Sequence, residues 1–454
     1  MSSRRPPRAS GRRTSKSFAL PAWSAVSFDL ILRGATLPDG RVDVDIAVRG
    51  GRIVAIERAI EAEAGIVLDA KGRLVAPPFV DCHFHMDATL SLGLPRLNQS
   101  GTLLEGIALW GELKPLLTHE AVAERALRYC DLAVAQGLLA IRSHVDVCDD
   151  RLVAVEALLD VRAKVAPYLD LQLVAFPQDG YLRSPTAARN LARALDLGVD
   201  VVGGIPHFER TMAEGAASVT ALCEIAAQRG LRIDLHCDES DDPLSRHVET
   251  LAFEATRLGL GGRAAGSHLT SMHSMDNYYV SKLLPLIAES GMFVVANPLI
   301  NITLQGRHDG YPRRRGLTRI PELRAQGVPV ALGQDCVMDP WYGLGGADML
   351  DVAHMAVHAV PMTSREAIRW SFDAVTEIPA RVMGLDGYGL AVGNFADMVV
   401  LQAADPIEAV RLRAARLAVI RRGRVVARAA PRVCELFLPG RSSSVDPAAY
   451  APRT

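Results

Sequence analysis

The middle of the sequence alternates short apolar runs with amphipathic segments, and this alternation constrains the fold more than any other feature. Between the runs lie Ala-, Leu- and Arg-rich segments with helical periodicity, such as 121–136 and 216–230. Eight strand–helix units over about 300 residues predict an α/β fold, a (β/α)8 TIM barrel. The eight runs are 74–85, 138–147, 171–178, 200–208, 232–239, 264–271, 292–300 and 328–336.

Both ends of the chain have a different, strand-rich character. Alternating Val and Ile with DG and GG turns in 28–76 are typical of small antiparallel hairpins, and similar strand patterns return at 393–402, 418–428 and 433–440. We therefore expect one small β-sandwich domain built from both chain ends beside a separate barrel. The predicted divisions are 1–27 (tail), 28–76 (N-terminal segment of the sandwich), 77–384 (metal-dependent catalytic barrel), 385–440 (C-terminal segment of the sandwich) and 441–454 (tail).

The first residues are basic and rich in Ser and Pro, with six Lys and Arg and no acidic residue before position 29. This composition predicts a disordered extension, with a transit peptide or an anion-binding arm as alternatives. The whole chain of 454 residues has 50 Lys and Arg against 51 Asp and Glu, which gives no charge signature for nucleic-acid binding.

Two further absences narrow the class of protein. No run of eighteen uncharged apolar residues occurs, so we expect no transmembrane helix and no membrane partner. The seven cysteines are scattered and never spaced as CxxC, which argues against a disulfide framework and against a Cys-based zinc site. A reducing, cytoplasmic location is the expectation.

Polar residues end most of the eight runs, which places them at the C-terminal rim where barrel enzymes carry out their chemistry. The first run ends in an HxH pair, and side chains two positions apart in a strand point to the same side. Neutral imidazoles with a carboxylate suit one divalent ion per subunit, such as Fe(II) or Zn(II). The candidate donors are His83, His85, His236, His268 and Asp335.

Other metal architectures are not supported. The sequence has no HExxH motif, and it lacks the PCxxC element that accompanies HxE in the zinc deaminases. A binuclear hydrolase of this barrel type would need a lysine in the fourth run, which has none. A mononuclear site is therefore the prediction.

The motifs on these runs are similar to those of the amidohydrolase superfamily, and more narrowly of the cytosine deaminase family. The resemblance extends from about residue 28 to about residue 430, and its most specific motifs are CHFHMD (82–87), VAFPQDG (174–180), HCDE (236–239) and DPWYGLG (339–345). It implies hydrolytic deamination of a free pyrimidine base, with attack of a metal-activated water on C4 and release of ammonia. It also implies a homo-oligomer.

The resemblance assigns roles residue by residue. It implies that Glu239 is the proton shuttle, that His268 contacts the attacking hydroxide, and that Gln178 grips the pyrimidine edge. Leu103, through its backbone, and Trp341 would line the same pocket, and Asp335 could also help a proton reach the departing ammonia. The implied metal ligands are His83, His85, His236 and Asp335.

Each of these residues also has a structural interpretation. Glu239 could be a solvated loop carboxylate, His268 could pack at the rim, and Gln178 could cap a loop. His144 and His207 also lie near strand ends, and we interpret both as structural.

One position departs from the family pattern. Cytosine deaminases usually have GHDD at the eighth strand, whereas this chain has GQDC at 333–336, so that Cys336 replaces the second Asp. A compact neutral thiol could pack against a methyl group that a carboxylate would reject, and burial of one methyl contributes about 0.8 kcal/mol. We therefore expect Cys336 to contact the substrate and 5-methylcytosine to be preferred. The alternative is an ordinary cytosine deaminase in which Cys336 only weakens contact with the amine.

Three competing interpretations remain. Isoguanine presents an edge like that of cytosine and would need a larger pocket. A triazine or ring-opening hydrolase of the same superfamily is the second alternative. A non-catalytic binding barrel is the third, and it would be expected to lose a metal ligand or Glu239, all of which are present.

Overall fold

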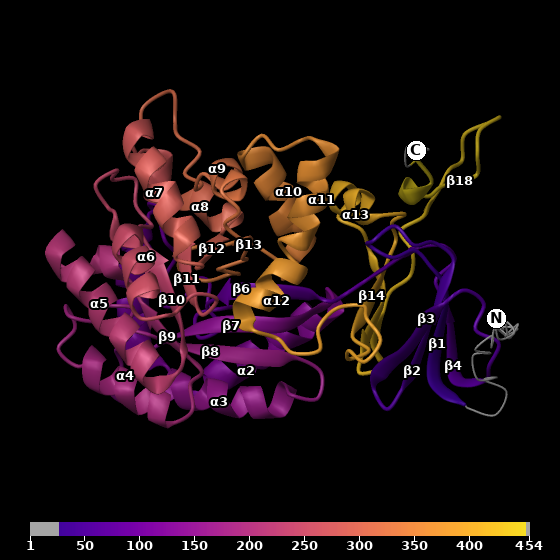
Figure 1. Ribbon diagram of the computed structural model, residues 1–454, viewed down its shortest axis with the longest axis horizontal. Coiled ribbons are helices and arrows are strands. Elements are labelled where there is room, and N and C mark those ends of the chain that lie inside the picture. The colour runs from indigo at the N-terminus through magenta and orange to yellow at the C-terminus, as the bar shows by residue number, and fades with distance from the viewer. Residues whose placement is uncertain (1–26, 451–454) are drawn as a thin grey trace, which may run out of the picture.

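A computed structural model describes residues 27–450 (Figure 1). The predicted basic tail therefore lies outside the described residues except for its last position, as do the last four residues of the predicted C-terminal tail. Within the described range, no helix combines the length and the apolar character that a membrane span requires.

An eight-stranded parallel sheet forms the larger portion of the molecule, and the predicted barrel is confirmed. The strands neighbour one another in sequence order, and a parallel bridge between Phe84 and Asp335 joins the last strand to the first. Paired backbone bonds, from His85 N to Asp335 O at 3.0 Å and from Asp335 N to His83 O at 2.9 Å, complete this closure. The strands are β6 (Phe79–Phe84), β7 (Leu138–Asp146), β8 (Asp170–Phe176), β9 (Val201–Gly204), β10 (Arg232–Cys237), β11 (Ala264–His268), β12 (Phe293–Ala296) and β13 (Val330–Leu332).

Helices surround this sheet (Figure 1). Their ends follow local chemistry: α5 begins where Thr211 accepts a bond from Glu214 N and ends at Gly230 in the left-handed conformation. The helices are α1 (Leu103–Leu113), α2 (His119–Ala135), α3 (Val153–Val165), α4 (Ala187–Asp196), α5 (Met212–Arg229), α6 (His247–Arg257), α7 (Asn277–Glu289), α8 (Pro298–Leu304), α9 (Ile320–Ala325), α10 (Met349–Ala359), α11 (Arg365–Asp373), α12 (Glu377–Met383) and α13 (Pro406–Leu412), with 3-10 turns at Lys114–Leu116, Pro206–Phe208, Thr270–His273 and Pro447–Tyr450.

Two four-stranded sheets pack on each other and form the predicted sandwich: one is N-terminal, and the other combines three C-terminal strands with β5 (Figure 1). Leu30 and Val75 share one apolar core with Met398 and Ile420. One sheet has the order β3-β2-β1-β4 and the other β16-β15-β14-β5. The strands are β1 (Phe28–Ala35), β2 (Val44–Arg49), β3 (Arg52–Glu57), β4 (Ala64–Asp69), β5 (Leu74–Ala76), β14 (Met398–Leu401), β15 (Arg416–Arg421) and β16 (Arg424–Arg428).

Three details differ from the expectation. The run 74–85 is not one strand: it is divided at Pro77 and Pro78, which lack the N–H that a ladder needs, into β5 of the sandwich and β6 of the barrel. β1 and β4 pair in parallel rather than as an antiparallel hairpin. The segment 433–440 does not join the sandwich: its strand β17 (Cys434–Glu435) pairs with β18 (Ser444–Val445) in a separate two-stranded sheet. Pro431, which has no N–H to donate to a ladder, lies between β16 and β17.

A buried polar cluster lies inside the barrel, below the ends of the strands. Arg142 of β7 is only 1% exposed, and its guanidinium donates to Asp234 Oδ2 at 3.0 Å and to the carbonyl of Val382 at 2.8 Å. Ser267 Oγ donates to the other oxygen of Asp234 at 2.7 Å, and Gln172 Oε1 accepts from Arg142 Nε at 2.7 Å. We call these four side chains the inner cluster; both oxygens of its carboxylate and each nitrogen of its guanidinium have a partner.

Candidate active site

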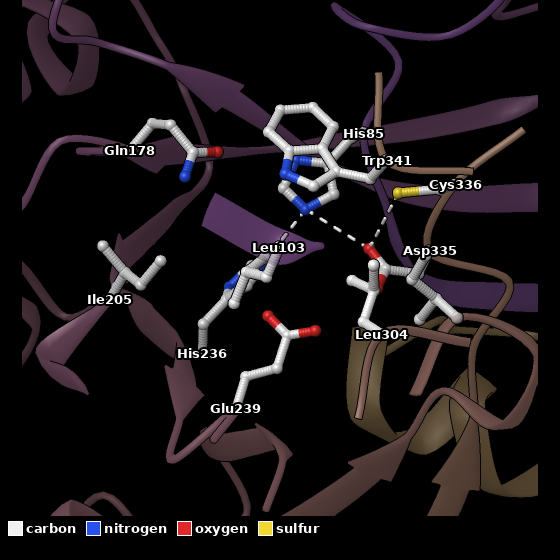
Figure 2. A pocket seen from close by; sticks show the side chains of 11 residues that line it. His85, Leu103, Gln178, Ile205, His236, Glu239, Leu304, Asp335, Cys336 and Trp341 are labelled. Carbon is white, nitrogen blue, oxygen red and sulfur yellow. Dashed lines mark hydrogen bonds and ion pairs between the residues drawn. The ribbon is translucent and has the colours of Figure 1, made fainter. Parts of the chain in front are cut away.

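The C-terminal ends of β6, β10 and β13 bring four predicted metal ligands together. The Nε2 atoms of His85 and His236 lie 3.0 Å apart. Asp335 Oδ1 lies 3.5 Å from His83 Nε2 and 3.4 Å from His85 Nε2. All four side chains are buried. Figure 2 shows His85, His236 and Asp335 facing one space.

The surroundings of these donors fit a divalent cation. Neither nitrogen of His83 nor Nδ1 of His236 has a hydrogen-bond partner among the described residues, although buried polar groups are normally paired. Burial lowers the pKa values of His83, His85 and His236 well below the usual range, so the imidazoles are neutral, which is the form that binds metal. Three imidazoles and one carboxylate at these separations could hold the ion that the sequence predicts.

Two overlapping groups of donors lie close enough together to hold a metal ion. One contains His83, His236, His268 and Asp335, and the other contains His83, His85, His144 and His236. The predicted set takes three members from each group. His144, interpreted from its sequence position as structural, is therefore closer to the donors than expected, with its ring centroid 4.3 Å from that of His83.

Backbone strain occurs at two of the site residues. His268 and Asp335 have φ values of 74° and 68°, in the left-handed region that non-glycine residues rarely adopt. The paired bonds between Asp335 and the end of β6 hold its backbone in place. Strained residues of this kind cluster at functional sites, where the surrounding structure sets their conformation.

Glu239 lies two residues beyond β10, and its carboxyl group points into the same space (Figure 2). The side chain is 5% exposed, and burial raises the pKa of the carboxyl group. Its Oε1 lies 3.4 Å from His268 Nδ1. No Lys or Arg within residues 27–450 pairs with this buried carboxyl group, and its place beside a cluster of metal donors suits it to exchanging protons with a bound molecule.

His268 lies behind Glu239 rather than on the cavity wall. Its Nδ1 is 2.9 Å from Asn301 Nδ2 and 3.3 Å from Asn297 Nδ2, and it is 3.9 Å from Asp335 Oδ2. Because an amide NH2 group can only donate, Nδ1 accepts from Asn301 and the proton of the neutral ring resides on Nε2. Neither asparagine was predicted as a site residue, although both belong to the 292–304 segment that contains the seventh strand and the helix after it.

A partly open pocket with about 340 Å³ of empty space, some of it open to solvent, lies above the donors. Every predicted substrate-contact residue lines it: Leu103, Gln178, Cys336 and Trp341. Cys336 Sγ lies 3.7 Å from Asp335 Oδ1 (Figure 2). The other lining residues are His85, His236, Glu239 and Asp335 from the polar site, and Ile205, Ile300 and Leu304, which sequence reasoning missed. Their position just beyond β9 and in α8 was the one available signal.

The fold and the site define a class, a barrel hydrolase with a metal-donor cluster at the C-terminal rim. The chain belongs to the amidohydrolase family, whose sequence profile matches residues 67–427. The resemblance inferred from the motifs is thereby confirmed.

Solved structures and relatives narrow this further. Two crystal structures of 5-methylcytosine deaminase from Klebsiella pneumoniae are 40% identical to this chain. The structure liganded with 5-fluorocytosine has a TM-score of 0.86 and covers 88% of this chain and 98% of its own. The structure liganded with phosphonocytosine has a TM-score of 0.87 and covers 90% of this chain and 100% of its own. An N-isopropylammelide isopropyl amidohydrolase of Pseudomonas sp. (strain ADP) is 30% identical over 88% of this chain and 97% of its own length. A pterin deaminase of Rhizobium rhizogenes is also 30% identical, over 88% and 91%. These similarities are consistent with the cytosine deaminase family and with hydrolytic deamination of N-heterocycles.

Proposed function

We propose that this protein deaminates a free pyrimidine base by hydrolysis and prefers 5-methylcytosine, which gives thymine, over cytosine, which gives uracil. One observation carries the proposal: metal donors, a buried carboxyl group, an amide and a neutral thiol line one pocket. The proposed cofactor is one Fe(II) or Zn(II) ion per subunit, held by His83, His85, His236 and Asp335.

When bound, such an ion lowers the pKa of a coordinated water from 15.7 to about 7. Glu239, whose carboxyl group enters the cavity, takes a proton from the attacking water and delivers it to N3 of the ring, which makes C4 electrophilic. His268, whose ring proton resides on Nε2, stabilises charge that develops on the attacking oxygen. Asp335 helps to pass a proton to the departing ammonia.

Gln178 is suited to recognise a neutral pyrimidine. Its amide offers one acceptor and a donor group, which match N1–H and O2 of the base. The side chain is 5% exposed and lines the cavity opposite Asp335 (Figure 2). A neutral amide at this position also leaves no uncompensated charge in the pocket when a neutral base binds.

Cys336 supports the preference for the methylated base. It lines the cavity directly after Asp335, at the position of the second Asp in the cytosine deaminase pattern. A thiol has an unperturbed pKa of about 8.5 and is polarisable and only weakly polar, so a methyl group can pack against it. Discrimination of one methyl group by a pocket reaches about 10–200-fold.

The test is ammonia release by the metal-loaded protein, measured over a range of concentrations of 5-methylcytosine, cytosine and isoguanine up to saturation. We expect the highest kcat/KM for 5-methylcytosine, and we expect Cys336→Asp to shift the preference towards cytosine. Cys434→Asp, the same replacement at an exposed cysteine, is the matched control and should leave the preference unchanged. A higher kcat/KM for cytosine in the unmodified protein would contradict the proposed preference and leave an ordinary cytosine deaminase.

A second candidate is deamination of isoguanine or hydrolysis of a related N-heterocycle. The similarity to a pterin deaminase and to an N-isopropylammelide amidohydrolase favours it, since both names describe action on larger or more substituted rings. Isoguanine in the same assay distinguishes this candidate, and absence of turnover with every base would favour a binding protein.

We further propose a cytoplasmic homo-oligomer. All seven cysteines are free, which suits a reducing compartment. The oligomer is proposed from the family resemblance, and light scattering of the purified protein would test it.

A further inference from the structure

Helix α1 lies directly behind the Trp341 wall of the cavity. Leu103, in the first turn of α1, lines the cavity together with Trp341. Gly106, one turn later, is buried and faces the indole from the other side: an ideal Cβ at this position would lie 2.2 Å from Cδ1 and 2.5 Å from Nε1 of Trp341. These separations are far below van der Waals contact, so the indole occupies the space of a missing side chain.

The backbone does not explain a glycine at position 106. The residue lies inside α1, does not have a positive φ, and donates its N–H to Thr102 O at 3.2 Å. A glycine within a helix is less stable than an alanine there. Gly111 of the same helix has nothing within 4 Å of its ideal Cβ, so close approach of an indole is specific to Gly106.

The indole lies between α1 and the cavity that it lines. The backbone N–H of Trp341 donates to Asp339 Oδ1 at 2.9 Å, and the ring centroids of Trp110 and Trp341 lie 6.1 Å apart. Trp110 is itself held by a 2.8 Å bond from its Nε1 to Asp146 Oδ2. The imidazole of His85 lies 6.3 Å from the indole on the cavity side. A side chain at 106 would therefore push the indole into the space above the metal donors.

We infer that Gly106 is a positioning residue that sets the size of the planar ring admitted to the cavity, by letting Trp341 retract into α1. Gly106 does not line the cavity and acts only through Trp341. The identity of the ring rests on the proposed function, whereas the position of the indole does not.

The first experiment compares Gly106→Ala with Gly111→Ala, its matched control on the same helix. Gly106→Ala should raise KM for 5-methylcytosine by about 10–200-fold and that for the smaller cytosine by less, while kcat changes little. Gly111→Ala should change neither KM. Equal effects of the two variants, or a loss confined to kcat, would overturn the inference.

The second experiment is rescue by a smaller ring. Trp341→Phe in the Gly106→Ala background should lower KM again, because a phenyl ring needs less space than an indole, so the two changes should be non-additive. If Gly106→Ala alone does not fold, the double variant should fold, because it removes the overlap. Additive losses, or a double variant that is no more stable than Gly106→Ala, would contradict the inference.

The third experiment needs no substrate and separates this inference from the proposed function. Gly106→Ala should change the intrinsic tryptophan emission of the ligand-free protein, and the change should vanish in the Trp341→Phe background; Gly111→Ala should leave the emission unaltered. If no base is turned over but this emission pattern is found, the proposed function fails and the placement of Trp341 stands. An unchanged emission in Gly106→Ala overturns the inference whatever the substrate is.

Discussion

Two buried polar clusters lie one above the other inside the barrel, and they differ in how their polar atoms are satisfied. In the inner cluster, Arg142 and Asp234 are paired with each other, and their remaining groups bond to Ser267, Gln172 and a carbonyl. The second cluster, which we call the mouth, contains the metal donors His83, His85, His236 and Asp335. Here His83 and His236 have nitrogens without hydrogen-bond partners among the described residues. The polar groups of the inner cluster are therefore satisfied within the protein, whereas the mouth has donor atoms that are left for a ligand to bind.

Removal of the metal should have the largest effect, and it acts directly on the metal donors at the mouth of the barrel. Treatment with a chelator is expected to abolish ammonia release, and readdition of Fe(II) or Zn(II) should restore it. A ligand at 1,000 times its Kd stabilises the folded state by about 4 kcal/mol, so the free energy of unfolding should fall on stripping. Metal analysis, thermal melting and the ammonia assay measure the metal content, the stability and the activity. Full activity of a metal-free sample would contradict the proposed need for a ligand at the mouth.

Glu239→Gln should come next, with a loss of about 10²–10⁴-fold in kcat/KM, which is the usual contribution of a general acid–base group. The metal content and the melting temperature should stay the same, because Gln has the same shape and no Lys or Arg of the described chain pairs with the carboxyl group. Glu249→Gln, on helix α6 and away from the cavity, is the control. A comparable loss in the control would show that the effect is not specific to the mouth.

Arg142→Met should act differently from Glu239→Gln: it should lower the stability of the protein strongly and change its metal content little. Loss of one partner of a buried ion pair costs about 3–5 kcal/mol because the other charge is left uncompensated. The double variant Arg142→Met with Asp234→Leu should recover some of this loss. Denaturant unfolding measures the stability of both variants. An Arg142→Met variant that is stable but binds no metal would contradict the view that the inner cluster stabilises the fold and the mouth binds the metal.

His144→Asn should have the smallest effect on metal affinity, and it tests whether His144 belongs to the inner cluster or to the mouth. Among the described residues its Nε2 has no hydrogen-bond partner; it lies 3.9 Å from Asp234 Oδ1, while its ring is close to His83. Outer groups around a metal site change affinity or activity by about 10–100-fold, and we expect at most the lower figure. Metal affinity from chelator competition measures this, and complete loss of metal would make His144 a ligand.

Much of the fold could be predicted because its signals are local. Each barrel strand is a short apolar run, and each run that ends in a polar residue indicates the rim. His83 and His85 could be paired from strand alternation alone, and closure of a barrel brings the ends of the other runs to them. The prolines at 77 and 78 were a local signal as well, and they could have divided the first run correctly.

What was missed depends on distances between segments far apart in the sequence. The parallel pairing of β1 with β4 depends on which strand reaches which sheet edge, and no local pattern encodes that. The contacts of Asn297 and Asn301 with His268 require the relative placement of α8 and β11. Gly106 gave no sequence signal because its importance comes from the indole that packs on it.

The closure of the barrel also has a consequence for biosynthesis. Gln334 N donates to Asp81 Oδ1 across 253 positions, and Asp335 meets the end of β6 at the same seam. Contacts between such distant positions form late, because the entropy of closing so long a loop must first be overcome. A nascent chain on the ribosome therefore cannot bring the four predicted donors together until residue 335 has emerged, so the complete donor set exists only after synthesis has passed the last barrel strand.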